Sequence, residues 1–507
     1  MPVKNILVSI LICQMICFYF VNSGNLLANH LARGYIMCLI RTWEDASFFV
    51  AERDGVMTKV AAKCIREQPR FRGIKQFEKK VPLLSPMIHG DGPEYIKKVF
   101  ESGENGSRLE EEVAACIGVG YAVALNSVTA AIHLALKLAA EKIYGSASGI
   151  STPDGLGKGG ALFGRRVFCP DFAASSAVNP VIYEGGEPVF IDASPEDWCM
   201  DPEVLAAAFD RYPDVKIVIM SHVYGFPGQV IKVREICREY GAVLIEDASG
   251  SLGATVNGRQ TGSFGDYGVL GFGPDKIITG GSGGILLTND AYSARKAKYW
   301  ATQAQAGVPW EQHEELGYSY RMDDITAAVI RGQLCYLPEH IARKREIYER
   351  YLEKLNGDVI FMNPVGEGTK PNYLISCMTS ESNIVFQETR SARDYTYTDQ
   401  HGTAAPMEIY DALQSFGAQG SPVYKPLHMQ PVFQSYEQIT LDGCWRAYQE
   451  FDQDDFWVRC DEGKRIFESG ICLPSHIGMT DEEQDRVVEI VNACFCEKMM
   501  DRGIYHA

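Results

Sequence analysis

The 507-residue sequence has no excess of positive charge, because 48 lysine and arginine residues face 65 aspartate and glutamate residues, a net charge of −17. Nucleic-acid phosphates attract basic proteins, so this balance argues against a nucleic-acid partner. The 15 cysteines include no Cys-x-x-Cys pair, and the most closely spaced are Cys494 and Cys496. A scattered, odd set of cysteines is typical of unpaired thiols in a reducing compartment, which predicts a cytoplasmic protein without a metal site.

The start of the chain has only a 16-residue apolar run, Ile6 to Val21, and no Ala-x-Ala cleavage motif after it. A membrane-spanning helix needs about 20 apolar residues. Three interpretations stay open: a signal peptide or short membrane anchor, a start read too early with translation beginning at a residue such as Met57, and an ordinary extension. We assign residues 1–80 to an N-terminal extension and leave membrane association open.

The rest of the chain alternates short apolar runs with helix-like segments. This spacing predicts an α/β fold with a mainly parallel sheet that helices cover on both faces. The predicted strands are Tyr121–Leu125, Arg166–Cys169, Pro188–Ile191, Lys216–Met220 and Ala242–Ile245, and the predicted helices are Glu94–Glu101, Leu109–Ile117, Ala130–Ala140, Pro202–Phe209 and Ile231–Tyr240. Apolar residues make up 46 % of the chain, which is ordinary for a globular protein of two or three domains.

The domain boundaries follow from this pattern. We expect a large domain at residues 81–330 and a small α+β domain at 331–507, bridged by two helices around Pro338. Residues 143–164 are rich in glycine and serine and predict a surface insertion. Thr480, with Glu483 three residues later, predicts a capping box at the start of a C-terminal helix.

One stretch carries the clearest chemical signal. The apolar run Ala242–Ile245 ends in Glu246 and Asp247, which places an acid at the carboxyl end of a buried parallel strand, where ligands bind in open α/β sheets. Lys276 follows, just before a cluster of glycines at 280, 281, 283 and 284 that lets other backbone approach closely. Each residue alone fits a plainer interpretation, Asp247 as a helix cap and Lys276 as a solvated turn residue.

A second signal lies at the first strand. Strand Tyr121–Leu125, the turn at residues 126–129 and helix Ala130–Ala140 leave free backbone amides and a helix dipole at the turn, which favours an anion. The alternative is an ordinary Ser/Thr helix cap at Ser127 or Thr129.

Four segments together resemble the DegT/DnrJ/EryC1/StrS family of sugar aminotransferases: Glu246-Asp247-Ala248, the Gly-Ser-Phe-Gly-Asp run at 262–266, Asp275 to Thr279, and the glycines at 283 and 284. These are pyridoxal-phosphate (PLP) enzymes of the aspartate-aminotransferase fold, fold type I, and the resemblance covers about residues 81–500. It implies that Lys276 holds PLP as a Schiff base and that Asp247 pairs with its pyridine nitrogen, the arrangement that lets the ring accept electrons. It also implies that the turn Ser127-Val128-Thr129 cradles the cofactor phosphate.

The resemblance extends to partners and substrate. The segment Gly317 to Met322 resembles a family segment whose asparagine reaches the cofactor of the neighbouring subunit, so Ser319 in that place implies a homodimer, and Arg321 is a candidate substrate contact. The segment at 422–431 resembles one near the substrate site, which implies that Lys425 and His428 contact substrate. A proline-rich turn with solvated charges is the alternative there, and we interpret His222 as a structural residue.

The chain departs from the family pattern at four positions. Val128 replaces a glycine, Gly250 a glutamine or glutamate, and Gly271 a serine that touches the phosphate. Ala174 aligns with an aromatic residue that stacks on the cofactor, and Phe172 takes over that role only if its loop shifts. A lost stack or hydrogen bond weakens binding by roughly 1 kcal/mol each. A catalytically decayed relative with a non-enzymatic role is therefore the rival interpretation.

The retained lysine favours transamination, because the dehydratase branch of the family has a histidine at that position. The resemblance implies transfer of an amino group from glutamate or glutamine to a nucleotide-linked 4-keto-6-deoxy sugar, for cell-surface polysaccharide or related biosynthesis. A keto-cyclitol acceptor stays open, because no residue in the sequence fixes the sugar or the base.

Overall fold

The computed structural model of the chain describes residues 65–85, 92–102, 106–145, 160–355, 357–380, 387–388, 395–396, 404–446 and 461–504. The chain divides between residues 64 and 65 into two units, and every described residue belongs to the second. The apolar run 6–21, Met57 and most of the predicted insertion at 143–164 lie outside the described residues. In the described part of the chain, no helix is both long and apolar enough to cross a membrane.

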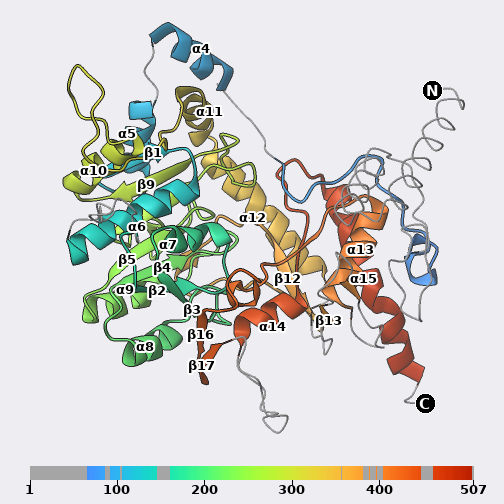
Figure 1. Cartoon of the computed structure of the whole chain (residues 1–507). Helices are drawn as coiled ribbons and strands as arrows, with labels where there is room; N and C mark the ends of the chain where they lie inside the picture. The colour runs from blue at the N-terminus through green and yellow to red at the C-terminus, as the bar shows by residue number, and fades with distance from the viewer. Residues whose placement is uncertain are drawn as a thin grey trace, which may run out of the picture. The chain divides into compact units, whose positions relative to one another are not determined.

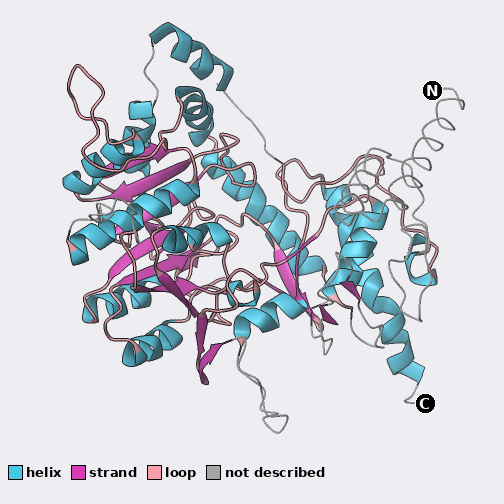
Figure 2. Ribbon diagram, viewed as in Figure 1, coloured by secondary structure: helices cyan, strands magenta, loops and turns pink. Residues whose placement is uncertain are grey.

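The largest sheet has nine strands (Figures 1 and 2). In spatial order they are β1 (Tyr121–Leu125), β9 (Gly284–Thr288), β8 (Tyr267–Gly271), β5 (Val243–Asp247), β4 (Ile217–Ser221), β2 (Arg166–Pro170), β3 (Glu187–Ile191), β16 (Glu437–Thr440) and β17 (Gly443–Arg446). The six strands from β8 to β16 run parallel, whereas β9 is antiparallel to both its neighbours and β17 to β16. The predicted α/β fold with a mainly parallel sheet is confirmed.

Helices cover both faces of this sheet. Successive strand residues point to opposite sides, so the apolar strands present apolar side chains on both faces. In β5, Val243 and Ile245 pack in one hydrophobic cluster and Leu244 packs in the other. The first cluster includes residues of α6 (Val128–Tyr144), α7 (Asn179–Tyr183) and α10 (Ala291–Ala301), and the second includes residues of α5 (Gly106–Ile117), α8 (Pro202–Arg211), α9 (Val230–Glu239) and α11 (Asp324–Leu334). Because helices cover both faces, every residue of strands β4, β5, β8 and β9 is buried, as expected for a mainly parallel sheet.

The predicted elements are all present, with small differences at their ends. The largest is in α6, which starts at Val128 and ends at Tyr144 rather than at 130 and 140. Ser127 caps its first turn and Gly145, at φ +91°, ends it, so the helix fills the whole interval between the two signals. The predicted capping box is confirmed, since Thr480 and Glu483 exchange hydrogen bonds before α15 (Asp481–Ile504).

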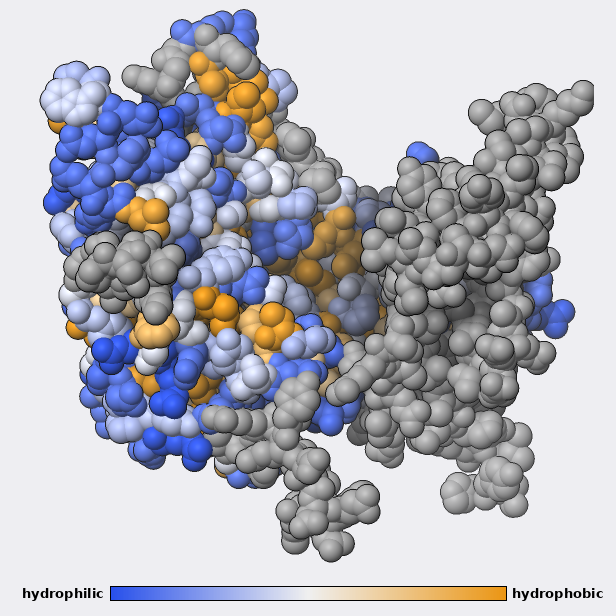
Figure 3. Space-filling model, in the orientation of Figure 1, coloured by the Kyte–Doolittle hydropathy of each residue, from blue (hydrophilic) through white to orange (hydrophobic). Residues whose placement is uncertain are grey.

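A second, antiparallel sheet has the order β10 (Ile360–Met362), β12 (Cys377–Ser380), β18 (Gly470–Cys472) and β15 (Ser421–Pro422), and we call it the small sheet. The elements outside the two sheets and their covering helices are α4 (Gly92–Ser102), α12 (Leu337–Lys354), α13 (Pro406–Phe416), α14 (Glu462–Ser469), the short strands β6 (Thr255–Val256), β7 (Arg259–Gln260), β11 (Thr369–Lys370), β13 (Gln387–Glu388) and β14 (Tyr395–Thr396), and the 3-10 turns Pro69–Phe71, Ser175–Ala177 and Leu427–Met429. On the face drawn in Figure 3, hydrophilic residues cover most of the described surface and apolar residues show only in separate patches.

Strands β16 and β17 come from residues 437–446, in the stretch that the sequence assigns to the small domain. They extend the large sheet through a parallel pairing of β16 with β3. The chain therefore returns to the large sheet after building part of the small one, a crossing that no composition change in the sequence marks. The domain boundaries at 81–330 and 331–507 stay predictions.

Candidate active site

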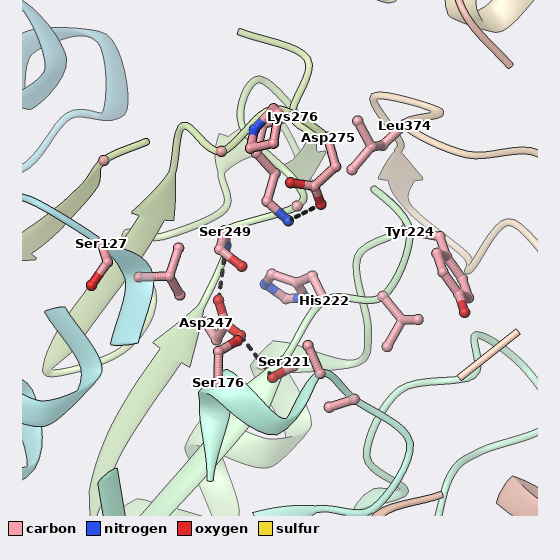
Figure 4. Close-up of a pocket in the computed structure, with 18 of the residues that line it drawn as sticks. Ser127, Ser176, Ser221, His222, Tyr224, Asp247, Ser249, Asp275, Lys276 and Leu374 are labelled. Atoms are coloured by element: carbon pink, nitrogen blue, oxygen red, sulfur yellow. Dashed lines mark hydrogen bonds and ion pairs between the residues drawn. The ribbon is translucent and has the colours of Figure 1, made fainter. Parts of the chain in front are cut away.

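A pocket of about 320 Å³ opens where the parallel strands β4 and β5 end. Asp247 is the last residue of β5, Ser221 is the last of β4, and both line the pocket together with Lys276. In Figure 4, Lys276 extends into the pocket from one side, and Asp247 lies on the opposite side with Ser249 and His222 between them. This is the edge of an α/β sheet at which ligands bind.

Asp247 is held by neighbouring groups on several sides. Its side chain is 5 % exposed, Ser221 Oγ donates to Oδ2 at 3.1 Å, and the Ser249 amide donates to Oδ1 at 2.9 Å. The main-chain carbonyl of Asp247 accepts the His222 amide at 3.0 Å. A carboxylate with two lone pairs satisfied in this way is fixed in orientation and keeps acceptor capacity toward the pocket.

Lys276 sits in a tight loop that reaches the pocket. Its Nζ lies 3.0 Å from Asp275 Oδ2, and its side chain is 15 % exposed whereas that of Asp275 is 53 % exposed. The Gly280 amide donates to the Phe272 carbonyl and closes the loop. A Cβ on Gly284 would stand 2.3 Å from the Ser127 carbonyl oxygen, so only glycine lets this loop pack against the start of α6.

The start of α6, where the sequence predicts an anion site, lies at the pocket. Ser127 is the N-cap of this helix, with Oγ accepting the Ala130 amide at 3.1 Å, and Asn126, Ser127 and Val128 all line the pocket. The first amides of a helix and its dipole favour a phosphate at this place. Thr129 is half-buried and is not among the lining residues.

Beneath the pocket, Glu246 and His222 form a buried pair. Glu246 accepts His222 Nε2 at 3.0 Å and the amides of Gly262, Phe264 and Gly265 at 2.6, 2.7 and 3.0 Å. Burial raises the pKa of Glu246, but the hydrogen bond from His222 and those from the backbone amides outweigh it, and the net shift is downward. The Gly228 amide donates to His222 Nδ1, so the ring carries its proton on Nε2. His222 therefore has the structural role we expected, and its ring also lines the pocket.

The side of the pocket away from the large sheet has residues that the sequence did not single out. We call Leu374, Ile375 and Tyr424 the small-sheet wall, because they precede β12 and follow β15, and Asp247 with Ser221 the sheet wall. Tyr224 stacks on Tyr424 with ring centroids 4.8 Å apart, and its hydroxyl accepts the Tyr424 amide at 2.7 Å.

Tyr224 takes this position through an unusual backbone. Its φ is +55°, the left-handed region that bulky residues rarely occupy. Gly225 follows at φ +91°, and a Cβ there would stand 1.9 Å from Asn372 Oδ1.

The loop after β2 brings alanines rather than an aromatic ring to the pocket. Ala173 and Ala174 line it, whereas Phe172 is 2 % exposed and packs against Trp198, Tyr224 and Tyr424 behind the wall. The loop shift that would bring Phe172 into the pocket is absent. Serines at 176, 249 and 282 also line the pocket, and no sequence pattern had marked them.

Four other predicted residues are not among those lining the pocket. Ser319 is exposed, and its carbonyl accepts Asn126 Nδ2 at 3.1 Å. Arg321 is also exposed and pairs with Asp324 at 3.2 Å, and Lys425 is half-buried next to Tyr424.

His428 is the fourth, and it lies between two carboxylates. Its Nδ1 is 2.7 Å from Asp171 Oδ2 and its Nε2 is 3.3 Å from Asp461 Oδ2. Burial lowers the pKa of His428, but the two carboxylates outweigh it and raise the pKa to about 10, so the ring is an imidazolium at neutral pH. Both ring nitrogens have protein partners.

The departures from the family pattern fit one another sterically. A Cβ on Gly271 would stand 2.7 Å from Val128 Cγ2 and 3.0 Å from Ser249 Cβ, so valine at 128 and a side chain at 271 exclude each other. A Cβ on Gly250 would meet nothing closer than 3.6 Å, so that position has room for a side chain. The valine fills the space that a serine at 271 would take.

Several known proteins are similar to this chain. Residues 95–492 match the DegT/DnrJ/EryC1/StrS aminotransferase family. A Bacillus subtilis protein named as the pyridoxal phosphate-dependent aminotransferase EpsN is 33 % identical over 426 residues, which are 82 % of this chain and 95 % of that protein. The GDP-perosamine synthase of Caulobacter vibrioides is 26 % identical, over 81 % of this chain and 96 % of that one.

Solved structures share the fold. The aminotransferase TlmJ from Streptoalloteichus hindustanus superposes with a TM-score of 0.65 at 24 % identity, covering 82 % of this chain and 98 % of that one. The PLP form of the sugar aminotransferase Spr1654 from Streptococcus pneumoniae superposes with a TM-score of 0.66 at 19 % identity, covering 83 % and 99 %. The predicted fold, enzyme class and cofactor are confirmed at the level of the family. The chain belongs to the DegT/DnrJ/EryC1/StrS aminotransferase family, whose members are PLP-dependent.

Proposed function

We propose that the chain transfers an amino group from glutamate or glutamine to a nucleotide-linked keto sugar, a 4-keto-6-deoxyhexose by preference, for cell-surface polysaccharide or related biosynthesis. The observation that carries this proposal is the placement of Lys276 and Asp247 on opposite sides of one pocket at the carboxyl end of β5. Relatives support the substrate class by name: GDP-perosamine synthases and the dTDP-4-dehydro-2,3,6-trideoxy-D-glucose 4-aminotransferase of Saccharopolyspora spinosa. The spore coat polysaccharide biosynthesis protein SpsC of Bacillus subtilis supports the biosynthetic role.

The residues present fit the cofactor. When bound, PLP supplies an aldehyde carbon and a ring that accepts electrons from the substrate carbon. Asp247, held by Ser221 and the Ser249 amide, is oriented to accept the ring N–H and to keep that nitrogen protonated. The start of α6 with Ser127 would hold the phosphate.

Lys276 is the proton carrier of the reaction. Its Nζ takes a proton from the amino-bearing carbon of the donor and returns one to the corresponding carbon of the acceptor. Asp275 lies 3.0 Å away, but its side chain is 53 % exposed, so solvent screens its charge and it has no required part in these steps. Tyr424 of the small-sheet wall and Tyr224, which stacks on it, form an aromatic surface that excludes water and offers a stacking face for a sugar or a base.

We also propose that the chain is a homodimer in which the exposed Ser319 donates to the phosphate of the partner's cofactor. Light scattering at working concentration would report a dimer. A monomer that still transaminates would refute this part of the proposal without touching the rest. Arg321 and Lys425 stay predicted substrate contacts, and we assign His428 a structural role because both its ring nitrogens are engaged.

The unpaired described thiols fit a reducing compartment, so we keep the cytoplasm as the proposed location. The rival function is a decayed relative that binds PLP without turnover, which the residues at 128, 174, 250 and 271 favour. A third candidate is amination of a keto-cyclitol.

One assay separates these candidates: glutamate- or glutamine-dependent amination across a panel of nucleotide keto sugars and keto-cyclitols. We expect turnover on a nucleotide 4-keto-6-deoxyhexose. Activity on cyclitols alone would support the third candidate. Activity on ordinary α-keto acids alone would overturn the sugar assignment, and binding of PLP without turnover on any acceptor would support the decayed relative.

A further inference from the structure

Two cysteines face each other across the small sheet. Cys377 of β12 and Cys472 of β18 are direct partners in the antiparallel register, and their sulfurs are 3.4 Å apart. Both residues are buried, at 0 % and 3 % exposed. Nearly a hundred residues of sequence separate them, so only the fold brings them together.

Directly opposite residues in an antiparallel sheet form either hydrogen-bonded or non-hydrogen-bonded pairs, and side chains lie closer together in the second kind. The Leu473 amide donates to the Ser376 carbonyl, one residue outside the cysteine pair on each strand. The cysteines therefore form a non-hydrogen-bonded pair, in which Cα atoms lie about 4.5 Å apart and side chains approach most closely. A disulfide requires Cα atoms about 4.4–6.8 Å apart, so the backbone already satisfies its main geometric condition.

Other buried cysteines of the described chain have a different environment. The Cys169 thiol donates to the Val167 carbonyl, and the Cys199 thiol donates to the carbonyls of Asp197 and Phe226. The thiols of Cys377 and Cys472 also reach backbone carbonyls, but only at 3.9 Å, whereas the two sulfurs lie closer to each other, at 3.4 Å.

We propose that Cys377 and Cys472 are a modification site, which a peroxide converts to a cross-strand disulfide and a dithiol reductant reopens. One cysteine sulfur attacks a peroxide oxygen and becomes a sulfenic acid, while the proton of that thiol passes to the departing hydroxide, which leaves as one water. The second thiol attacks that sulfur, forms the S–S bond and releases a second water. In sum the two thiols lose two hydrogens and hydrogen peroxide is reduced to two waters.

The place of the pair gives the disulfide a consequence for the pocket. Leu374 and Ile375 lie three and two residues before Cys377, and β18 pairs on its other edge with β15, through Ser421 opposite Cys472. Tyr424 follows β15 by two residues. A bond between β12 and β18 therefore fixes the strand that follows Leu374 and Ile375 against the strand that pairs with β15, which leads to Tyr424.

The test is peptide mapping of the full-length protein after treatment with hydrogen peroxide, alkylation under denaturing conditions, and comparison with a sample that is then reduced. We expect a linked peptide pair containing residues 377 and 472, its loss on reduction, and a melting temperature several degrees higher for the oxidised protein. Cys472→Ser should abolish the linked pair and the shift in melting temperature, while Cys169→Ser, which removes another buried thiol, should leave both unchanged.

The mapping needs no cofactor or substrate, so its result is independent of the proposed function. It also needs no variant, so a misfolded Cys472→Ser protein would not remove the test. Full alkylation of both residues after peroxide treatment would overturn the proposal, and so would a link from either cysteine to a different one, or oxidation of either to a sulfinic acid without a link.

Discussion

The sheet wall and the small-sheet wall of the pocket bury charge in opposite ways. Behind the sheet wall, Glu246 is a buried carboxylate that four donors stabilise, and its pKa is lowered. Behind the small-sheet wall, Lys344 of α12 is fully buried, and its Nζ donates to the carbonyls of Leu374 and Ser475 with no carboxylate among those partners. Burial lowers the pKa of Lys344 to about 7.

Because of this difference, the two buried groups stabilise the fold in different pH ranges. A carboxylate with a lowered pKa stabilises the fold above its ordinary pKa and loses that contribution as the pH falls through the lowered value. A lysine with a lowered pKa is disfavoured in its charged form, so its wall is weakest below pH 7. The chemistry of the sheet wall is therefore stable in neutral solution, whereas the small-sheet wall gains stability on the alkaline side.

Removing the lysine of the pocket should have the largest effect. With Lys276→Ala we expect loss of the visible absorption of lysine-bound PLP and a fall in turnover of at least about 10³-fold, since both the covalent anchor and the proton carrier are gone. Absorption spectra with excess PLP and single-turnover kinetics measure the two effects. Wild-type protein that never develops this absorption would overturn the role of Lys276.

The sheet wall itself is tested at Asp247. Asp247→Ala should still take up PLP and show a visible band, but turnover should fall by about 10²-fold or more because the ring nitrogen loses its partner. Asp275→Asn, which alters the exposed carboxylate beside Lys276, is the matched control and should keep most activity. Equal losses in the two variants would contradict the distinction between a buried, oriented acid and a solvated one.

The small-sheet wall is tested through Lys344. Between pH 7 and the ordinary lysine value of 10.5, the unfolded chain binds a proton at Lys344 that the folded chain does not, so the contribution of Lys344 to stability should rise with pH in this window. Each unit of pKa difference corresponds to about 1.4 kcal/mol. His428, whose pKa is raised to about 10, contributes a slope of the opposite sign over much of this range, so the test is a comparison. Urea unfolding from pH 7 to 10 should give a clearly more positive slope in the wild type than in Lys344→Met, and identical slopes would contradict the assignment.

The same contrast governs what the sequence could predict. Asp247 was predictable because a strand that ends in an acid is a local signal, and Lys276 because glycines mark its loop. The small-sheet wall was not, since Tyr224 and Tyr424 meet across 200 residues of sequence and Tyr224 depends on a left-handed backbone that no side-chain pattern encodes. The chain's return to the large sheet through β16 was hidden for the same reason, because its partner β3 is about 250 residues away.

The smallest effect we predict concerns the start of α6, at Val128 and Gly271. Gly271→Ser alone should weaken PLP binding and destabilise the fold by about 1–3 kcal/mol, because its Cβ would stand 2.7 Å from Val128 Cγ2. Adding Val128→Gly removes this contact and leaves the milder approach to Ser249 Cβ at 3.0 Å. The new hydroxyl, at about 1 kcal/mol per hydrogen bond, should then tighten PLP binding by up to about fivefold relative to wild type. A glycine at the first position of the helix costs up to about 1 kcal/mol of stability, so Val128→Gly alone is the control.

Titration of each protein with PLP, followed by its visible absorption, gives the four affinities of a double-mutant cycle. We expect strong coupling, with the serine harmful beside valine and helpful beside glycine. Additive effects would mean that Val128 and Gly271 act separately on the cofactor, and the steric exclusion between them would then have no bearing on binding. Strong coupling would mean that Val128 and Gly271 together are a single change in packing. Any further weakness in PLP binding would then come from the side chains missing at Gly250 and Ala174.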